Sequence, residues 1–344
     1  MRFSQHKEVA VLVLNWNGRT LLQQFLPSWL AHTPDYADLI IVDNGSTDDS
    51  VSFLQEHYRD VHLLAFEENL GFAGGYNRAI EELDYQTVIL LNSDVELTSG
   101  WLDQPMQLLN SSPKIAAVQP TLRAQRSPKD FEYAGAAGGF IDRLGYPFCR
   151  GRIFDTIEED RGQYADSVDL FWASGACLII RRAVYREVGG LDTLFFAHQE
   201  EIDLCWRLNA RGWRIVSAPQ SIVYHVGGAS LSADSPRKVF LNFRNNLLMI
   251  YKNLPAPTLY RVLFARMILD LVAMLVYLLR LRPGQAASVL KGWRCFLIKR
   301  QRYESTRQEN LKKTVRPISP ELMKPYTLLF QYYFKGKKRY SDLP

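Results

Sequence analysis

The chain has 344 residues, of which 47% are hydrophobic and 22% are charged, a composition that excludes a disordered protein and allows one large or two smaller domains with an ample core. Its net charge of +5 is uneven, because residues 291–344 carry fourteen Lys or Arg and four Asp or Glu, which leaves residues 1–290 at −5. A slightly acidic body with a basic end argues against an extended nucleic-acid surface and favours contact with anionic lipid headgroups or phosphorylated acceptors. A solvated basic tail without a partner is the alternative.

The N-terminus and the cysteines indicate a reducing compartment. The apolar segment at residues 9–14 is strand-sized and no small-residue cleavage site follows it, so no export signal is visible. The four cysteines are widely spaced without a CxxC pair, and they suggest neither a zinc site nor a disulfide framework: Cys149, Cys177, Cys205 and Cys295. We therefore expect a cytoplasmic protein.

The first 120 residues alternate strand-sized apolar runs with helix-length segments. The predicted strands are 9–14, 38–42, 61–66, 87–91 and 115–118, and the predicted helices lie near 19–31, 47–58, 72–84 and 99–110. This alternation predicts a parallel α/β sheet. In such sheets ligands bind outside the carboxyl ends of the strands.

Polar residues follow the predicted strands at those ends, and we expect them to converge on one edge: Asn15, Asn17, Asp43, Asn44, Asn69, Asn92, Ser93 and Asp94. Residues 43–50 and 92–94 also suit simple turns or helix caps. The glycine-rich segment 69–79 opens a helix, yet its spacing is neither G-x-G-x-x-G nor a P-loop, which disfavours a simple dinucleotide fold. Asp94 could hold Mg²⁺ or Mn²⁺ together with substrate phosphates.

Three carboxylates begin an amphipathic helix within residues 195–215: Glu200, Glu201 and Asp203. Its packing face comprises apolar positions from Ile202 to Leu208, and Gly212 is a plausible stop. These carboxylates suit a catalytic site, but helix starts also favour acidic residues for their dipole alone.

The composition changes after residues 254–257, LPAP, which mark a boundary. Residues 258–281 form an apolar helix candidate whose longest uninterrupted apolar run, Leu271 to Leu279, is too short to cross a bilayer. Arg266 and Asp270, four residues apart within it, could pair. We favour an in-plane or re-entrant membrane helix over one packed on protein, and either over a true span. Residues 292–298, GWRCFLI, with basic residues around them, suit an interfacial anchor.

Seven segments in order resemble family 2 inverting glycosyltransferases of the GT-A fold, specifically their bacterial rhamnosyltransferase-like branch: VAVLVLNWNG, IIVDNGSTDDS, ENLGFAGGYNRAI, VILLNSDVEL, FWASGACLIIRRAVYREVGGLD, EEIDLCWRLNARGW and VYHVGGASL. The resemblance covers roughly residues 8–250. It implies an α/β nucleotide-diphospho-sugar transferase domain at 1–253. Beyond the motifs, the apolar helix candidate and the basic composition predict a C-terminal helical, membrane-associating extension at 254–344. We expect the first part to bind donor without the second.

The resemblance also implies a donor site. Asn15 and Asp43 match positions that contact the base and ribose, with Asn17 beside them, and Asp43 would accept the imide N–H of uracil or thymine. Gly71, Gly74 and Asn77 match the nucleotide crevice, and Arg78 would reach the diphosphate. Asn92, Ser93 and Asp94 occupy the place of the D-x-D metal motif, with Asn replacing the first Asp. His225 matches a position near the metal and diphosphate, although a lone histidine is often a satisfied core group.

On the acceptor side, Glu201 aligns with the general base of the E-D motif, where most relatives have Asp. Glu200 and Asp203 remain alternatives for the base. Trp172, Ser174 and Gly175 match the acceptor segment, and Trp172 would either stack on a sugar ring or fill the core.

The implied activity is metal-dependent inverting transfer of a sugar to a saccharide acceptor in bacterial surface polysaccharide assembly. A lipid-linked acceptor would suit a protein bound peripherally to an anionic membrane surface, at the cytoplasmic face of the inner membrane. Two alternatives are a catalytically weak nucleotide-sugar-binding scaffold, motivated by Asn92 and Glu201, and a nucleotidyltransferase. The second is disfavoured because no lysine-bearing glycine loop follows the first strand. A homodimer is left open, and the donor sugar is not identified.

Overall fold

Strands alternate with helices through the first part of the chain, as predicted. The computed structural model describes residues 7–227 and 235–344. In the first part the elements are β1 (Val9–Asn15), α1 (Arg19–His32), β2 (Ala37–Asn44), α2 (Ser50–His57), β3 (His62–Phe66), α3 (Gly71–Glu82), β4 (Thr87–Asn92), β5 (Val95–Glu96), α4 (Asp103–Ser111) and β6 (Ile115–Ala124).

The main sheet has the strand order β3-β2-β1-β4-β12-β6-β13-β5, with β7 (Ser127–Phe131) paired to β6. The strands β3, β2, β1 and β4 are parallel, but β12 (Cys177–Arg181) runs antiparallel between β4 and β6. The five strands predicted within the first 120 residues, β1, β2, β3, β4 and β6, therefore all run in one direction, as predicted. The antiparallel β12 comes from a later part of the chain, because the chain leaves the sheet after β6 and returns through β12. The sheet is mixed, and the last strands are β13 (Arg214–His225) and β5.

Two apolar layers cover the faces of this sheet. Along β1, Ala10 and Leu12 face one core with α3, while Val11 and Val13 face the other with α1. Because successive side chains of a strand point to opposite faces, a strand buried on both sides must be apolar throughout. This explains the uninterrupted apolar runs of the sequence.

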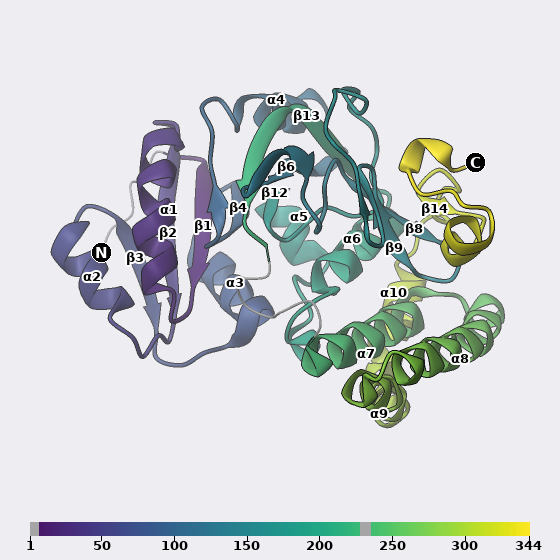
Figure 1. The fold of residues 1–344 in the computed structure, drawn as a ribbon. Helices are drawn as coiled ribbons and strands as arrows, with labels where there is room; N and C mark the ends of the chain where they lie inside the picture. Colours follow the sequence, from purple (N-terminus) through teal and green to yellow (C-terminus); the bar gives the residue numbers. More distant parts are fainter. Residues whose placement is uncertain (1–6, 228–234) are drawn as a thin grey trace.

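A second, five-stranded sheet has the order β11-β10-β9-β8-β14. Its strands come from two distant parts of the chain: β8 (Gly139–Asp142), β9 (Pro147–Cys149), β10 (Arg152–Ile153), β11 (Thr156–Ile157) and, from the C-terminal tail, β14 (Met323–Lys324). The backbone N–H of Leu328 donates to Asp142 Oδ2 at 2.8 Å. The tail thus completes a sheet of the body, as Figure 1 shows beside β8 and β9.

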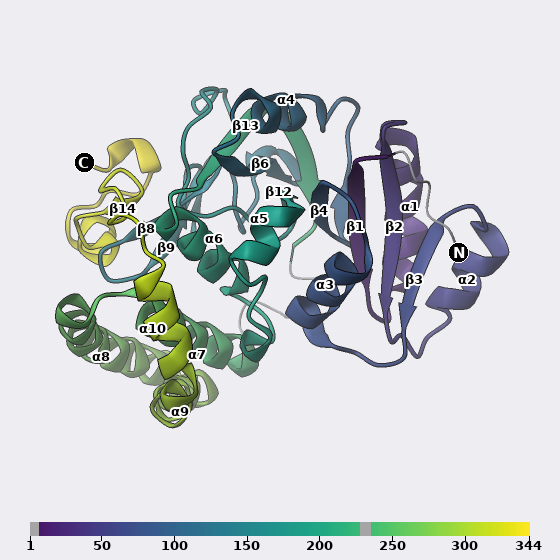
Figure 2. The ribbon, with the colours of Figure 1, turned by 180° about the vertical axis from the view of Figure 1, so that it is seen from behind.

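The remaining helices precede and follow the predicted boundary at residue 254. They are α5 (Arg182–Glu187), η1 (Thr193–Phe195), α6 (Glu200–Ala210), α7 (Pro236–Asn253), α8 (Ala256–Leu279), α9 (Pro283–Lys299), η2 (Arg300–Tyr303), α10 (Glu304–Lys312), η3 (Phe330–Phe334) and η4 (Tyr340–Asp342). Figures 1 and 2 show α7 to α10 gathered away from α1 and α2. By length and composition α8 could cross a membrane, contrary to the prediction from its longest apolar run.

Candidate active site

The register of β1 and β2 brings Asn15 and Asp43 side by side at the carboxyl edge of the sheet. Asn15 Nδ2 donates to Asp43 Oδ1 at 2.9 Å, and both residues are buried. Ser46 also donates to Asp43, from its backbone N–H and its hydroxyl. Asn15 Oδ1 has no hydrogen-bond partner in the described chain, and a Cβ at Gly18 would lie 2.3 Å from it. An amide oxygen kept free in this way suits a ligand that donates a hydrogen bond.

Asn17 shapes the same edge from the loop after β1. Its side-chain oxygen accepts the backbone N–H of Thr47 at 2.7 Å, and its own N–H donates to Ser46 Oγ at 2.9 Å. Asn17 has a φ of +50°, a conformation that asparagine tolerates better than most residues. It therefore fixes the two loops that carry the predicted base-binding residues.

The glycines at the start of α3 have steric reasons to be glycine. Gly71 has a φ of +73°, and a Cβ at Gly74 would lie 2.9 Å from Leu70 Cβ. Asn44 holds this turn, since it donates to the Gly71 carbonyl and accepts the N–H of Leu70 at 3.0 Å in both cases. The backbone at Gly71 is thus fixed next to β2, as a nucleotide crevice requires.

Asn77 and Arg78, in contrast, are engaged with the protein. Asn77 donates to the carbonyl of Leu191 at 2.8 Å and accepts from the N–H of Leu191 and the hydroxyl of Tyr185. Arg78 is exposed and pairs with Glu82 one turn along α3. Asn77 thus fastens α3 to the loop before η1, and Arg78 lies in a surface ion pair; their predicted roles in donor binding stay predictions.

The motif Asn92-Ser93-Asp94 ends β4 and leads into β5, which pairs with the end of β13. This pairing sets His225 opposite Val95, and His225 Nε2 lies 3.0 Å from Asp94 Oδ1. The other ring nitrogen, Nδ1, lies 3.3 Å from Glu132 Oε1 in an ion-pair contact. All three side chains are buried. The predicted association of Asp94 with His225 is present, and Glu132 extends it.

Electrostatics at this cluster favour a cation. Burial alone would lower the pKa of His225, but the hydrogen-bonding carboxylates of Asp94 and Glu132 raise it to about 10. Sequence reasoning missed Glu132 because it follows β7, SPKDF, a short polar strand without an apolar pattern. The glycine two residues after His225 was a usable signal, since a Cβ at Gly227 would lie 2.8 Å from Glu132 Oε1.

A carboxylate and an imidazole are suitable donors for Mn²⁺, and the carboxylate also suits Mg²⁺. The Asp94 carboxylate therefore fits the predicted metal. His225 binds a metal only as the neutral imidazole, so a metal there would have to displace the proton that Asp94 and Glu132 stabilise on its ring. No group of three His, Cys, Asp or Glu arranged to hold a metal is found within residues 7–227 and 235–344. Diphosphate oxygens and water would have to supply the other ligands, as is usual for magnesium and manganese at nucleotides.

The loop before α6 carries unusual backbone conformations. Phe196, His198 and Gln199 all have φ between +68° and +75°, which non-glycine residues rarely adopt. Asn245 on α7 holds this loop, because its Nδ2 donates to the carbonyls of Ala197 and His198 at 2.8 Å and of Phe195 at 3.0 Å. Such local strain persists only where the surroundings enforce it, and it often occurs at functional sites.

Glu201 is distinctive within α6. Every other residue of this helix is buried, so the predicted amphipathic helix is in fact enclosed nearly all round. Burial raises the pKa of Glu201 to about 7, and burial together with Glu201 raises the pKa of Glu200 well above its ordinary value. Glu201 is thus the one residue of α6 that is only partly buried, and the pKa of its carboxyl suits a group that accepts a proton near neutral pH.

Asp203 is removed from the candidate bases by its surroundings. It is fully buried, and its carboxylate accepts hydrogen bonds from Lys252 at 2.8 Å, Asn253 at 2.9 Å and Arg207 at 3.1 Å. Although burial would raise its pKa, Lys252 and Arg207 hold the pKa below its usual range. Asp203 therefore anchors α6 to α7.

The predicted acceptor segment lies directly before β12. Trp172 fills the core, since its ring is buried and its indole N–H donates to the carbonyl of Phe140 at 2.9 Å. Ser174 is also buried, with its N–H donating to Gln119 Oε1 at 2.7 Å. Gly175 is the member that meets the candidate base, because a Cβ there would lie 3.8 Å from Glu201 Cβ and 3.3 Å from the Phe72 ring.

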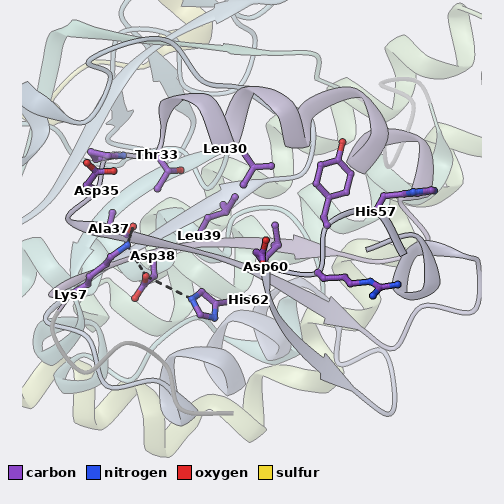
Figure 3. Close-up of a pocket in the computed structure, with 14 residues that line it drawn as sticks. Lys7, Leu30, Thr33, Asp35, Ala37, Asp38, Leu39, His57, Asp60 and His62 are labelled. Carbon is purple, nitrogen blue, oxygen red and sulfur yellow. Dashed lines mark hydrogen bonds and ion pairs between the residues drawn. The ribbon is translucent and has the colours of Figure 1, made fainter. Parts of the chain in front are cut away.

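A hollow of about 450 Å³ lies elsewhere, at the amino ends of β2 and β3 (Figure 3). Within it Asp38 pairs with Lys7 at 3.1 Å and accepts the hydroxyl of Tyr85 at 2.8 Å. The carboxylate is therefore satisfied by the protein. Because ligands of such sheets bind at the carboxyl ends of the strands, the polar edge at Asn15, Asp43 and Asp94 is the better candidate.

Comparison with known families and sequences agrees with this site. The family model described as Glycosyl transferase family 2 matches residues 10–189. The N-acetylglucosaminyl-diphospho-decaprenol L-rhamnosyltransferase of Mycobacterium tuberculosis is 28% identical over 242 residues, which cover 65% of this chain and 78% of the relative. The O-antigen biosynthesis protein RfbC of Myxococcus xanthus is 27% identical over 66% of this chain, but the match spans only 18% of that protein.

Solved structures support the fold. The mannosyltransferase PcManGT of Pyrobaculum calidifontis, in complex with GDP-Man and Mn²⁺, gives a TM-score of 0.52 at 14% identity, with 86% of this chain and 88% of that one covered. GalNAc-T7 with UDP, GalNAc and Mn²⁺ gives a TM-score of 0.55 at 15% identity, covering 73% of this chain and about half, 49%, of that one. These likenesses confirm the predicted GT-A arrangement, here with α7 to α10 following the motifs.

Proposed function

Because the chain belongs to glycosyl transferase family 2, we propose that it is an inverting, metal-dependent transferase that moves a hexose from a nucleotide diphosphate donor to a saccharide acceptor. The observation that carries this proposal is the position of Glu201. It is the one residue of α6 that is only partly buried, and the raised pKa of its carboxyl, about 7, suits a general base.

The chemistry assigns the two sides of the site different tasks. On the donor side, Asn15 and Asp43 would bind the base and ribose, and Asp94 with His225 would hold Mg²⁺ or Mn²⁺. When bound, that metal supplies positive charge to the departing diphosphate. On the acceptor side, the hydroxyl oxygen attacks the anomeric carbon as the bond to the diphosphate oxygen breaks. The hydroxyl proton passes to Glu201, and the nucleoside diphosphate leaves with its bonding electrons.

The names of two relatives support a finer proposal. One is a rhamnosyltransferase named for a lipid diphosphate substrate, and the other is an O-antigen biosynthesis protein. We therefore propose that this chain, too, extends a lipid-linked saccharide during surface polysaccharide assembly, at the cytoplasmic face of the membrane. The basic C-terminal segment suits such an acceptor, since it would hold the enzyme at an anionic surface.

A thermal-shift screen of the full chain against nucleotide-sugars, with and without Mn²⁺, tests the donor side, because ligands that bind the native state raise its melting temperature. The stabilising donor is then incubated with saccharide and lipid-linked acceptors, and released nucleoside diphosphate is measured. Release of pyrophosphate instead would indicate a nucleotidyltransferase. If donor binds but no nucleoside diphosphate is released, either with any acceptor or in the absence of acceptor, the chain is a binding scaffold.

A further inference from the structure

The helix α8 buries a charged pair and exposes most of its apolar residues. Its buried side comprises Leu259, Val262, Arg266 and Asp270. The opposite side carries exposed apolar residues, which we call the outer face of α8: Tyr260, Phe264, Met267, Ile268, Leu271, Val272, Leu275, Val276, Leu278 and Leu279. This distribution is the reverse of that of a surface helix in water.

The buried side of α8 is fixed to the protein by hydrogen bonds of a charged pair. Arg266 Nε lies 3.3 Å from Asp270 Oδ1, and both residues are at most 2% exposed. Trp293 of α9 donates to Asp270 Oδ2 at 2.9 Å, and Arg266 donates to the carbonyl of Leu144 and to Asn246. If α8 left this packing, Arg266 and Asp270 would keep each other but would lose these hydrogen bonds to α9, α7 and the loop at Leu144, which opposes separation of the helix. The helix therefore presents only its outer face.

The surroundings of this face are basic. Residues 256–303 contain nine Lys or Arg and a single acidic residue, the buried Asp270. Apart from Arg266, these basic residues remain at or near the surface, among them Arg261 on α8 itself and Arg280 just after it. Figures 1 and 2 both show α8 at the outer edge of the molecule.

The outer face could be covered by a bilayer or by a second copy of the chain. A symmetric dimer would set the same basic residues of two copies close together, and like charges oppose such contact. An anionic leaflet attracts the basic residues near its surface, and its acyl boundary accepts the apolar side chains. The charge distribution thus favours the leaflet.

We propose that the outer face of α8 docks in the plane of an anionic membrane leaflet, with α8 lying along the surface rather than crossing it. This inference deepens the proposed function, since it states how the enzyme would meet a lipid-linked acceptor. It also separates two alternatives that sequence alone leaves open. The helix is packed on the protein through its polar side and is in contact with lipid through its apolar side.

The test uses the full chain and two kinds of vesicle, phosphatidylcholine alone and phosphatidylcholine with phosphatidylglycerol, without donor or acceptor. Wild type is expected to sediment with the anionic vesicles. The double variant Ile268→Glu, Leu275→Glu should lose more than about tenfold in vesicle affinity, because it buries charge in place of apolar surface. The matched control is Leu30→Glu on α1, an equally exposed leucine at the other end of the molecule, which should bind as wild type does.

Orientation is tested by labelling Phe264→Cys, Leu271→Cys and Leu278→Cys one at a time with an environment-sensitive fluorophore. These positions lie on one line along α8, about 21 Å from first to last. Equal quenching by shallow spin-labelled lipid at all three supports an in-plane helix. A deeper middle position would show a span and overturn the proposal.

Two other results would overturn the proposal. One is vesicle binding that the double variant leaves unchanged. The other is a wild-type chain that binds no vesicles but self-associates, with the self-association lost in the double variant. Donor binding by thermal shift is measured on every variant. If donor binding and transfer to a soluble acceptor persist while vesicle binding fails, the proposed activity stands and the docking inference falls. The converse result would refute the activity alone.

Discussion

Glu201 decides whether the proposed mechanism is right. The change Glu201→Gln keeps size and hydrogen bonding but removes the proton acceptor, so we expect transfer to fall by roughly 10²–10⁴-fold while donor affinity is preserved. Initial rates and donor thermal shifts measure the two effects separately. Glu200→Gln is the matched control, since Glu200 is buried and burial together with Glu201 raises the pKa of its carboxyl well above its ordinary value. If Glu200→Gln loses transfer and Glu201→Gln does not, the general base is Glu200.

The pH dependence of transfer follows from the same group. Burial raises the pKa of Glu201 to about 7, so below pH 7 the carboxyl is protonated and cannot accept the acceptor's proton. The rate should therefore rise with pH through about 7 and then level. The residual rate of Glu201→Gln should lack this step. A wild-type rate that is flat between pH 5 and 8 would exclude Glu201 as the base.

Asp94 is the charged member of its motif, and we expect Asp94→Asn to weaken Mn²⁺ binding and abolish metal-dependent transfer while the fold is retained. Calorimetric titration with Mn²⁺ gives a readout independent of activity. Asp60→Asn, an exposed carboxylate at the opposite edge of the sheet, should behave as wild type. Full turnover in Asp94→Asn that a chelator still abolishes would place the metal elsewhere.

At the level of residues, the sequence predicts where a side chain lies when its position along a strand determines its place in the fold. Asn15, Asp43 and Asp94 follow buried strands, and parallel pairing must bring such positions to one edge. Sequence reasoning failed where a partner distant in sequence decides. The Asp203 carboxylate is paired with Lys252 on α7, a contact that no local pattern encodes. Glu132 was missed for the same reason.

At the level of elements, the loop before α6 depends on α7. Asn245 satisfies three carbonyls of a segment with strained backbone, so Asn245→Ala should destabilise the loop and misplace Glu201. We expect a loss of roughly 1–3 kcal/mol in unfolding free energy and a larger loss in transfer than in donor binding. Denaturant unfolding and the two assays measure this. Parallel losses in transfer and donor binding would show that the loop does not position the base specifically.

The elements themselves were predictable only where periodicity is strong. The first strands and helices were found near their observed bounds because strands buried on both faces give continuous apolar runs. The insertion of β12 between β4 and β6 was not predictable, because strand order depends on the path of residues 122–168. That path includes strands of only two to five residues, whose pattern is too short to be recognised.

For the whole molecule, the C-terminal tail changes what truncation should do. Sequence alone suggested that residues 1–253 would bind donor without the rest. In the structure, β14 pairs with β8, Leu328 and Phe296 are buried, and the Asp142 carboxylate, whose pKa burial raises to about 6, accepts the N–H of Leu328. Removal of residues 254–344 would remove all of these contacts at once and expose the surfaces that they cover.

We therefore expect a chain ending at residue 253 to unfold non-cooperatively or to aggregate, rather than to survive as a donor-binding fragment. Leu328→Ala should act in the same direction with a smaller effect, roughly 2–5 kcal/mol, because a buried leucine is truncated without removing the strand. The three chains are compared by their melting temperatures, monitored by tryptophan fluorescence, and by the rise in melting temperature that donor causes. A truncated chain that melts cooperatively and binds donor would show that the tail only covers the body. We expect thermal stability to fall from wild type to Leu328→Ala and to fall further in the truncated chain. That order would show that the helical C-terminal part and the preceding α/β part fold as one unit.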